Sequence, residues 1–221
     1  MKFETVEFKQ KKLSLKEISI RSKNFYKFIK KRRSIRNFDK LKINDEIIKN
    51  AILAAGSAPN GANLQPWHFS IIKDNKIKKK IRKAAEKEEK NFYNFKAPQT
   101  WLEALKPLGT DSNKKFLENA PVLIVIFEKK ITVKDNKKIK NYYVKESVGI
   151  ATGILISCLH YAGLCMLTHT PNPMSFLNKI LNRPNNEKPF VILVVGYAGK
   201  NCKTPKFSEQ KKKIEEITTL Y

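Results

Sequence analysis

Lys31-Arg-Arg-Ser-Ile-Arg-Asn-Phe38 is the stretch of this 221-residue chain that says most about its fold and its chemistry. Four of its residues are cationic, and two arginines flank a Ser-Ile pair. Planar guanidinium groups bind two oxygens at once, so together with a serine hydroxyl they suit a phosphate monoester. A solvated basic surface, or a short patch for nucleic acid, is the alternative that this segment alone leaves open.

The composition around this segment is that of a folded, strongly basic protein. Hydrophobic residues make up 41% of the chain, which allows a substantial core, and the length suits one domain. The net charge is +25, yet only six of the 45 basic residues are Arg. Proteins that read nucleic acid rely on Arg for bidentate contacts, and Lys is spread here along the whole chain. We therefore expect weak binding of polyanions at low salt, but no nucleic-acid partner.

Cysteine and histidine spacing predicts neither a disulfide framework nor a metal site. The three cysteines form no CxxC pair, so we expect a reducing, cytoplasmic compartment. The three histidines have no ligand-like spacing, so we expect no metal site. Residues 147–167 carry no charge over a length that could span a bilayer. They are rich in small residues and interrupted by Ala162-Gly163, which fits a buried helix over about 144–161 better than a membrane span.

Periodicity predicts helices and strands mixed without strict βαβ alternation, an α+β fold. Helices are expected at about 24–31, 44–55, 74–93, 144–161 and 174–181. Strands are expected at 67–73, 122–127 and 190–197 and from 164, with a charged hairpin or loop at 129–141. Residues 95–113 show no regular pattern. We expect one domain over 1–221, with a basic lead-in at 1–23 and a C-terminal extension from about 198 to 221.

The common catalytic motifs of hydrolases, nucleotide-binding proteins and zinc proteases do not occur in the sequence. Because the chain then offers few candidate acids and bases, an enzyme of this sequence is expected to use an organic cofactor.

Arg32-Arg-Ser-Ile-Arg36 resembles the flavin-binding opening of the nitroreductase superfamily. Ala58–Trp67 and Val195-Gly-Tyr197 match further landmarks of that superfamily. Four stretches resemble, more narrowly, the iodotyrosine deiodinase subfamily of that superfamily: Glu86–Tyr93, Trp101, Tyr142–Gly149 and Leu167–Met174. The resemblance is collinear from about Phe28 to Pro205.

This resemblance implies a nitroreductase-like fold, with a central mixed, mainly antiparallel sheet flanked by helices. It also implies an intertwined homodimer with FMN in clefts at the subunit interface. The FMN contacts that it assigns are Arg32, Arg33, Ser34, Ile35, Arg36, Asn60, Thr168, His169, Thr170 and Lys211.

The roles that the resemblance assigns to these residues differ. Arg32, Arg33 and Ser34 would hold the phosphate and ribityl chain, and Arg36 would lie near the N1/O2 side of the flavin, where a cation favours the anionic reduced form. Thr170 would be catalytic, because its hydroxyl would donate to flavin N5. The sequence departs from the family at two of these positions. Asn60 stands where the family commonly has Ser, and Lys211, one of three consecutive lysines, where it has Arg.

The resemblance also implies an active-site lid over about 89–115. In it Glu89 would pair with the ammonium of a halotyrosine, Lys114 with the carboxylate, and Tyr93 would hydrogen-bond between them. The Ala62 N–H would point at the phenolate oxygen. Without the resemblance, Glu89 and Tyr93 read as part of an ordinary charged surface helix.

The expected function is therefore FMN-dependent reductive dehalogenation of halogenated tyrosines, iodotyrosine giving tyrosine and iodide, through a flavin semiquinone. NAD(P)H or a reductase would be the electron donor. The alternatives are a general NAD(P)H-dependent nitroreductase or quinone reductase of the same fold, and a basic protein that binds nucleic acid without catalysis.

Overall fold

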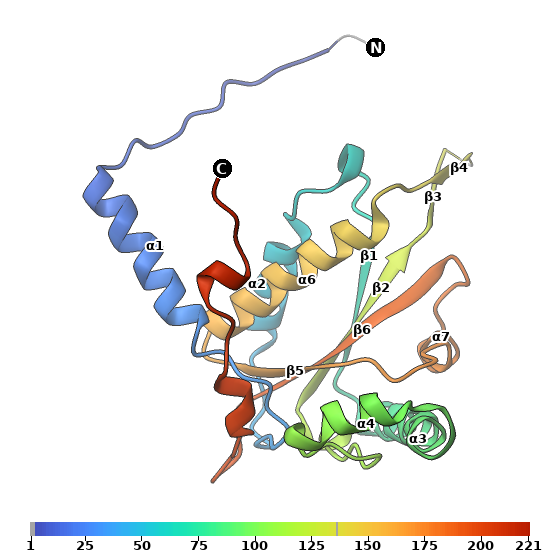
Figure 1. The fold of residues 1–221 in the computed structure, drawn as a ribbon. Coiled ribbons are helices and arrows are strands. Elements are labelled where there is room, and N and C mark those ends of the chain that lie inside the picture. Colours follow the sequence, from blue (N-terminus) through green and yellow to red (C-terminus); the bar gives the residue numbers. More distant parts are fainter. Residues whose placement is uncertain (1–2, 136) are drawn as a thin grey trace. The chain divides into compact units, whose positions relative to one another are not determined.

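A computed structural model describes residues 3–135 and 137–221 as two compact units that divide between Arg32 and Arg33 (Figure 1). The N-terminal unit contains one helix, α1 (Leu15–Ile29). It begins at the cap of Ser14, whose hydroxyl accepts from the N–H of Glu17, and the Glu17 carboxylate pairs with Arg21 at 2.6 Å. The helix thus starts well before the predicted start near residue 24, because these local polar contacts extend it through a stretch that looked only basic.

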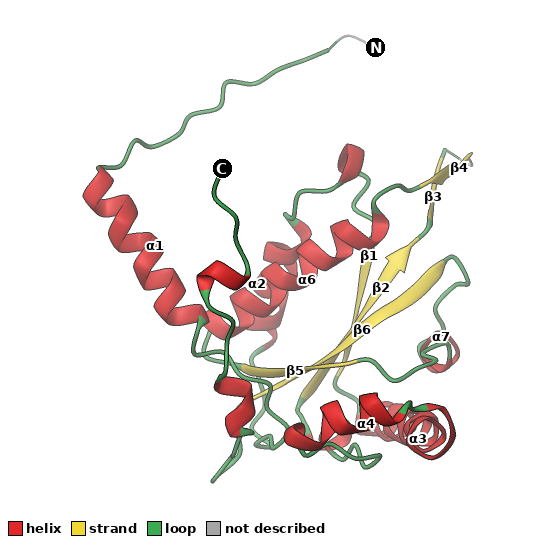
Figure 2. Ribbon diagram, viewed as in Figure 1, coloured by secondary structure: helices red, strands yellow, loops and turns green. Residues whose placement is uncertain are grey.

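The second unit is built on a four-stranded sheet in the order β1-β2-β6-β5, with every neighbouring pair antiparallel (Figure 2). Its strands are β1 (Trp67–Ile72), β2 (Val122–Lys129), β5 (Cys165–His169) and β6 (Glu187–Gly196). An isolated parallel bridge joins Ser34 to Met166 of β5. The hairpin β3 (Ile131–Lys134) and β4 (Lys137–Lys140) lies where a charged hairpin or loop was predicted. The predicted mainly antiparallel sheet is confirmed.

Helices cover both faces of this sheet. One face carries α2 (Asp45–Gly56) and α6 (Val144–Tyr161), and the other carries α3 (Asn75–Asn91), α5 (Phe116–Asn119) and α7 (Phe176–Ile180). Because side chains alternate along a strand, β2 contributes to both cores. Its residues in the α2/α6 core are Val122, Ile124 and Ile126, and those in the α3/α5/α7 core are Leu123, Val125 and Phe127.

Sequence signals placed most of these elements correctly. Asn44 and Asp74 cap α2 and α3 through their side chains, and α6 has the predicted bounds. The irregular region is more ordered than predicted, because it contains α4 (Gln99–Leu105), which begins after Pro98. The remaining turns are η1 (Gly61–Asn63), the π-helical η2 (Phe92–Lys96), η3 (Lys106–Leu108), η4 (Lys206–Glu209) and η5 (Ile214–Glu216).

A glycine at the end of β6 closes the sheet against the segment from Arg33. A Cβ on Gly196 would lie 2.8 Å from the Pro121 ring and 2.9 Å from the Phe38 ring, so a larger residue would collide with both. Phe38, 6% exposed, is held in the core by a bridge to Ala198. The Val195-Gly-Tyr197 landmark is therefore a packing requirement.

Within the described part of the chain, no helix combines the length and the apolar character needed to cross a membrane. In α6, Leu155 and Leu159 are fully buried in the core, whereas Ile150 and Tyr161 are exposed, so the uncharged run identified in the sequence packs one face of a helix into the protein interior.

Candidate active site

The segment after Arg33 runs beside β5 and presents alternate side chains to core and surface. The Ile35 N–H donates to the Met166 carbonyl at 3.1 Å, and the Ile35 side chain is 7% exposed in the core. Ser34 and Arg36, on either side of it, line a hollow of about 440 Å³ together with Lys106. The motif thus places one hydroxyl and one guanidinium in this hollow, while its isoleucine fixes the segment to the sheet.

Arg36 also lines a second hollow, of about 230 Å³, which includes Thr110 and Phe116. The guanidinium is half-buried, and loss of solvent lowers its pKa, while the nearby Tyr93 opposes this shift. The pKa of the Tyr93 phenol is raised, chiefly by burial. Arg36, in the predicted cofactor segment, therefore lies beside residues of the predicted lid.

The three predicted lid residues lie together. Lys114 Nζ is 3.1 Å from Glu89 Oε2, and both side chains are largely buried, 4% and 14% exposed. The same ammonium donates to Thr110 Oγ1 at 3.2 Å and lies 5.7 Å from the centroid of the Tyr93 ring. The Tyr93 hydroxyl makes a long contact, 3.4 Å, to the Thr110 carbonyl. A desolvated pair of opposite charges beside a phenol is thus available to a ligand that carries both charges.

Tyr93 lies where the α-helical geometry of α3 ends. The residue lies in η2, where the chain takes up one π-helical turn after α3, a geometry that is frequent at functional sites. Phe92, in the same turn, makes edge-to-face contacts with Tyr93 at 5.5 Å and with Trp101 of α4 at 5.0 Å between ring centroids. These aromatic contacts connect η2 with α4 across the lid.

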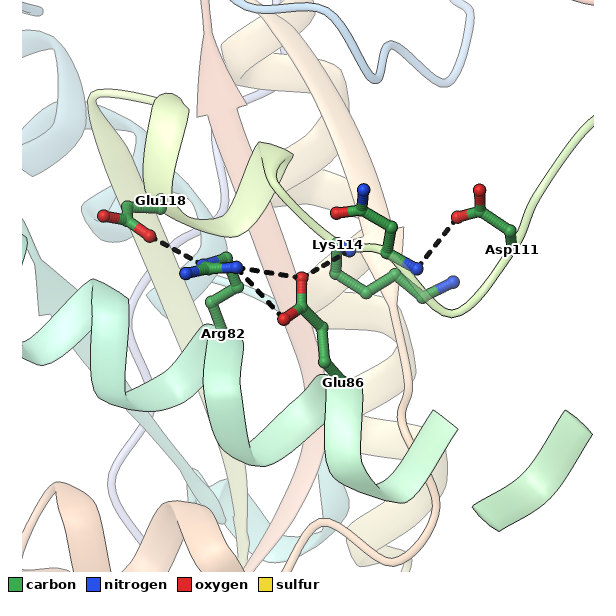
Figure 3. Close-up of polar contacts among 6 residues, drawn as sticks. Arg82, Glu86, Asp111, Lys114 and Glu118 are labelled. Atoms are coloured by element: carbon green, nitrogen blue, oxygen red, sulfur yellow. Dashed lines mark hydrogen bonds and ion pairs between the residues drawn. The ribbon is translucent and has the colours of Figure 1, made fainter. Parts of the chain in front are cut away.

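A polar network that sequence reasoning missed anchors the far end of the lid (Figure 3). The Glu86 carboxylate accepts from the backbone N–H of Lys114 at 2.9 Å and from Arg82 at 3.0 Å. Arg82 Nε donates to Glu118 of α5 at 2.6 Å. Nearby, the N–H of Asn113 donates to Asp111 at 2.9 Å. The only sequence signal for this network is the i, i+4 spacing of Arg82 and Glu86 on α3.

Side chains at the end of β5 alternate between solvent and the protein interior. Thr168 and Thr170 are exposed, whereas His169 between them is buried at 8% exposure. The imidazole meets Phe116 edge-to-face at 5.4 Å between ring centroids, and its Nε2 is buried without a hydrogen-bond partner. Burial first, then Lys114 and Arg36, lower the pKa of His169 from 6.5 to about 3. Two hydroxyls are therefore accessible here, and one neutral imidazole lies behind them.

The predicted substrate amide lies elsewhere in the chain. Ala62 is exposed in η1 with left-handed φ and ψ of 49° and 28°, and Asn60 Oδ1 accepts from the Gln65 N–H at 2.8 Å. A Cβ on Gly61 would lie 3.1 Å from the Tyr143 ring, so this turn adjoins the start of α6. Figure 1 shows the turn, in cyan, well apart from α3 and α4. Within one copy of the chain, Asn60 and Ala62 therefore lie apart from the lid.

Lys211, the predicted C-terminal cation, hydrogen-bonds to neighbouring residues of the chain. Lys211 is exposed, and its Nζ donates to the Ser208 carbonyl at 2.6 Å. Lys203, which the sequence gave no reason to select, instead lines the hollow with Ser34 and Arg36. Arg32 ends the N-terminal unit, where its N–H donates to the Ile29 carbonyl at 3.1 Å.

Among residues 3–135 and 137–221, no group of three or more His, Cys, Asp or Glu side chains is placed to hold a metal ion. The three cysteines are free thiols.

The fold agrees with the comparison to known protein families. The family model described as "Nitroreductase family" matches residues 29–197, and the chain belongs to this family.

Within the family, the chain is similar to proteins named iodotyrosine deiodinase. The relative from Haliscomenobacter hydrossis is 49% identical over 89% of this chain and 89% of its own length. The one from Homo sapiens is 40% identical over 91% of this chain and 70% of its own. A crystal structure of oxidized iodotyrosine deiodinase bound to FMN and 3-iodo-L-tyrosine matches with a TM-score of 0.76 and 32% identity, covering 86% of this chain and 96% of that one.

Proposed function

We propose that this protein is an FMN-dependent reductive dehalogenase that converts iodotyrosine to tyrosine and iodide. The observation that carries the proposal is the buried Glu89–Lys114 pair beside Tyr93, a residue that also acts on the charge of Arg36. The resemblance to iodotyrosine deiodinases, one of them solved with FMN and 3-iodo-L-tyrosine, supports the same reading.

The residues present fit a phosphorylated flavin. The hollow at Ser34 and Arg36 offers a hydroxyl, a guanidinium and the ammonium groups of Lys106 and Lys203, a donor set suited to anionic oxygens. We infer that Arg32, Arg33 and Ser34 hold the phosphate and that Arg36 lies at the flavin edge where negative charge develops. Because Arg36 is half-buried, its charge acts there with little screening by water.

Further contacts with the flavin are proposed at three positions. Asn60 and the exposed Thr168 and Thr170 offer hydrogen-bonding groups, and we assign the Thr170 hydroxyl to flavin N5. Ile35 contributes its backbone position only, because its side chain belongs to the core. The C-terminal cation is assigned to Lys203 in preference to Lys211, because Lys203 lines the hollow.

The lid is proposed to bind the amino-acid part of the substrate. Glu89 and Lys114 pair with each other in the structure, and a zwitterionic ligand could instead pair its ammonium with Glu89 and its carboxylate with Lys114. Removing either protein charge would leave its partner buried and unpaired, which is strongly unfavourable. The pair therefore selects ligands that bring both charges, and it disfavours a bare phenol.

The reaction replaces a carbon–iodine bond by a carbon–hydrogen bond and consumes two electrons and one proton. Reduced FMN supplies the two electrons when it is bound. The protein's part is to orient the ring, exclude water under the lid, and stabilise the phenolate oxygen through the Ala62 N–H.

We propose that the protein is a homodimer. Asn60 and Ala62 lie near the start of α6 and apart from the lid, so a second copy would have to bring them to the flavin. We also propose a cytoplasmic protein, consistent with three free thiols, that receives electrons from NAD(P)H or a reductase.

Anaerobic turnover tests the proposal. Protein reconstituted with FMN and supplied with dithionite should release iodide and tyrosine from 3-iodotyrosine in equal amounts. Turnover of nitroaromatics or quinones with NAD(P)H, without iodide release, would instead indicate a general reductase. A protein that binds no FMN would contradict both.

A further inference from the structure

His169 lies where the end of β5 meets the end of the lid. Its ring contacts Phe116 edge-to-face, and the charged groups that act on it are Lys114 and Arg36. Its partner across the sheet, on β6, is the apolar Ile192. Two cations therefore act on the charge of this imidazole, while the carboxylate of Glu89 in the lid is engaged by Lys114.

The Nε2 atom of His169 lacks a hydrogen-bond partner and is closed off from solvent. A buried polar atom without a partner is unfavourable and calls for an explanation. Phe116, which contacts the ring, and Lys114, which acts on its charge, belong to the segment that ends the lid and begins α5. Displacement of this segment would let water reach Nε2 and satisfy it.

We infer that His169 is a positioning residue that sets the balance between a closed and an open lid. The neutral imidazole lets Phe116 pack on it and Lys114 remain nearby, whereas a proton on the ring would repel Lys114 and favour the open lid. The inference rests on the proposed function only in taking the lid as the element that closes over the ligand.

The direction in which pH shifts the lid follows from the pKa of His169 in the closed lid and in the open lid. In the closed lid the pKa of His169 is about 3, because of burial and the two cations, whereas a solvated imidazole has its ordinary value of 6.5. Protons therefore bind the open lid more tightly. The advantage of the closed lid is complete above pH 6.5 and is lost as the pH falls toward 3. Between about pH 7.5 and 5.5, the closed-to-open ratio should fall about tenfold.

Hydrogen exchange of residues 92–115 in the FMN-loaded protein tests this without any substrate. His169→Gln keeps a hydrogen-bonding side chain but cannot titrate, and His160→Gln on α6 is the matched control. At about pH 5.5 the wild-type lid should exchange about tenfold faster relative to His169→Gln than it does at about pH 7.5. Chemical exchange rates change with pH equally in all three proteins, so they cancel. An equal ratio at both pH values would overturn the inference.

A second measurement needs no variant. The chain has three histidines, so their ring signals can be followed by NMR in the wild-type protein. With 3-iodotyrosine bound, the signal of His169 should not titrate between pH 7.5 and 5; titration near 6.5 in that complex would refute the inference. If 3-iodotyrosine does not bind at pH 7.5, the proposed substrate fails, while the exchange experiment still decides the role of His169.

Discussion

The substitution Glu89→Gln tests the lid directly, because it removes one charge and keeps the side-chain size. In the structure, Glu89 Oε2 lies 3.1 Å from Lys114 Nζ, and the two side chains are 14% and 4% exposed. In the proposed complex, the substrate ammonium would face an amide instead of a carboxylate. Loss of one partner in a desolvated charge pair costs about 2–5 kcal/mol, so the Kd of 3-iodotyrosine should rise about 30-fold or more.

The assay is quenching of FMN fluorescence by the ligand, measured for 3-iodotyrosine and for 2-iodophenol, which has no amino-acid group. Glu89→Gln should weaken only the first ligand and leave the FMN content unchanged. Glu88→Gln is the matched control, because Glu88 precedes Glu89 on α3 and lies about 100° around the helix. Equal weakening of both ligands, or loss of FMN from the variant, would show that Glu89 is structural and refute the reasoning.

Three other substitutions test separate parts of the account. Gly196→Ala should lower the free energy of unfolding by about 1–3 kcal/mol in urea titrations, because its Cβ would lie 2.9 Å from the Phe38 ring; unchanged stability would contradict the packing argument. Lys203→Gln should weaken FMN binding about two- to fivefold, whereas Lys211→Gln should not; the reverse order, measured by equilibrium dialysis, would restore Lys211 as the phosphate contact. Thr170→Ala should slow iodide release at unchanged FMN content, and an unaltered rate would remove its catalytic role.

Local signals determined most of the fold. The caps at Asn44 and Asp74, the apolar runs of β2 and β6, and the uncharged α6 depend on neighbours in the sequence, so they could be predicted from it. The early start of α1 was missed because the cap at Ser14 lies in a run of basic residues. The helix α4 was missed because it is short and has no buried face to set a periodicity.

The site was predictable as residue types and only partly as geometry. The resemblance indicated Glu89, Tyr93 and Lys114 as lid residues, and in the structure these three side chains lie close together. The support given by Glu86 to the Lys114 backbone could not be predicted, because it joins residues far apart in the chain. The burial of His169 and its unpartnered nitrogen likewise arise from tertiary packing.

The central claim is that an amino-acid ligand is held by both of its charges over a flavin that two copies of this chain enclose. A crystal structure of the protein with FMN and 3-iodotyrosine tests it most directly. We predict the ligand's ammonium at Glu89, its carboxylate at Lys114, and the Ala62 N–H of the second copy at its phenolate oxygen. A ligand seated on the flavin with its ammonium and carboxylate in solvent, away from Glu89 and Lys114, would contradict the account.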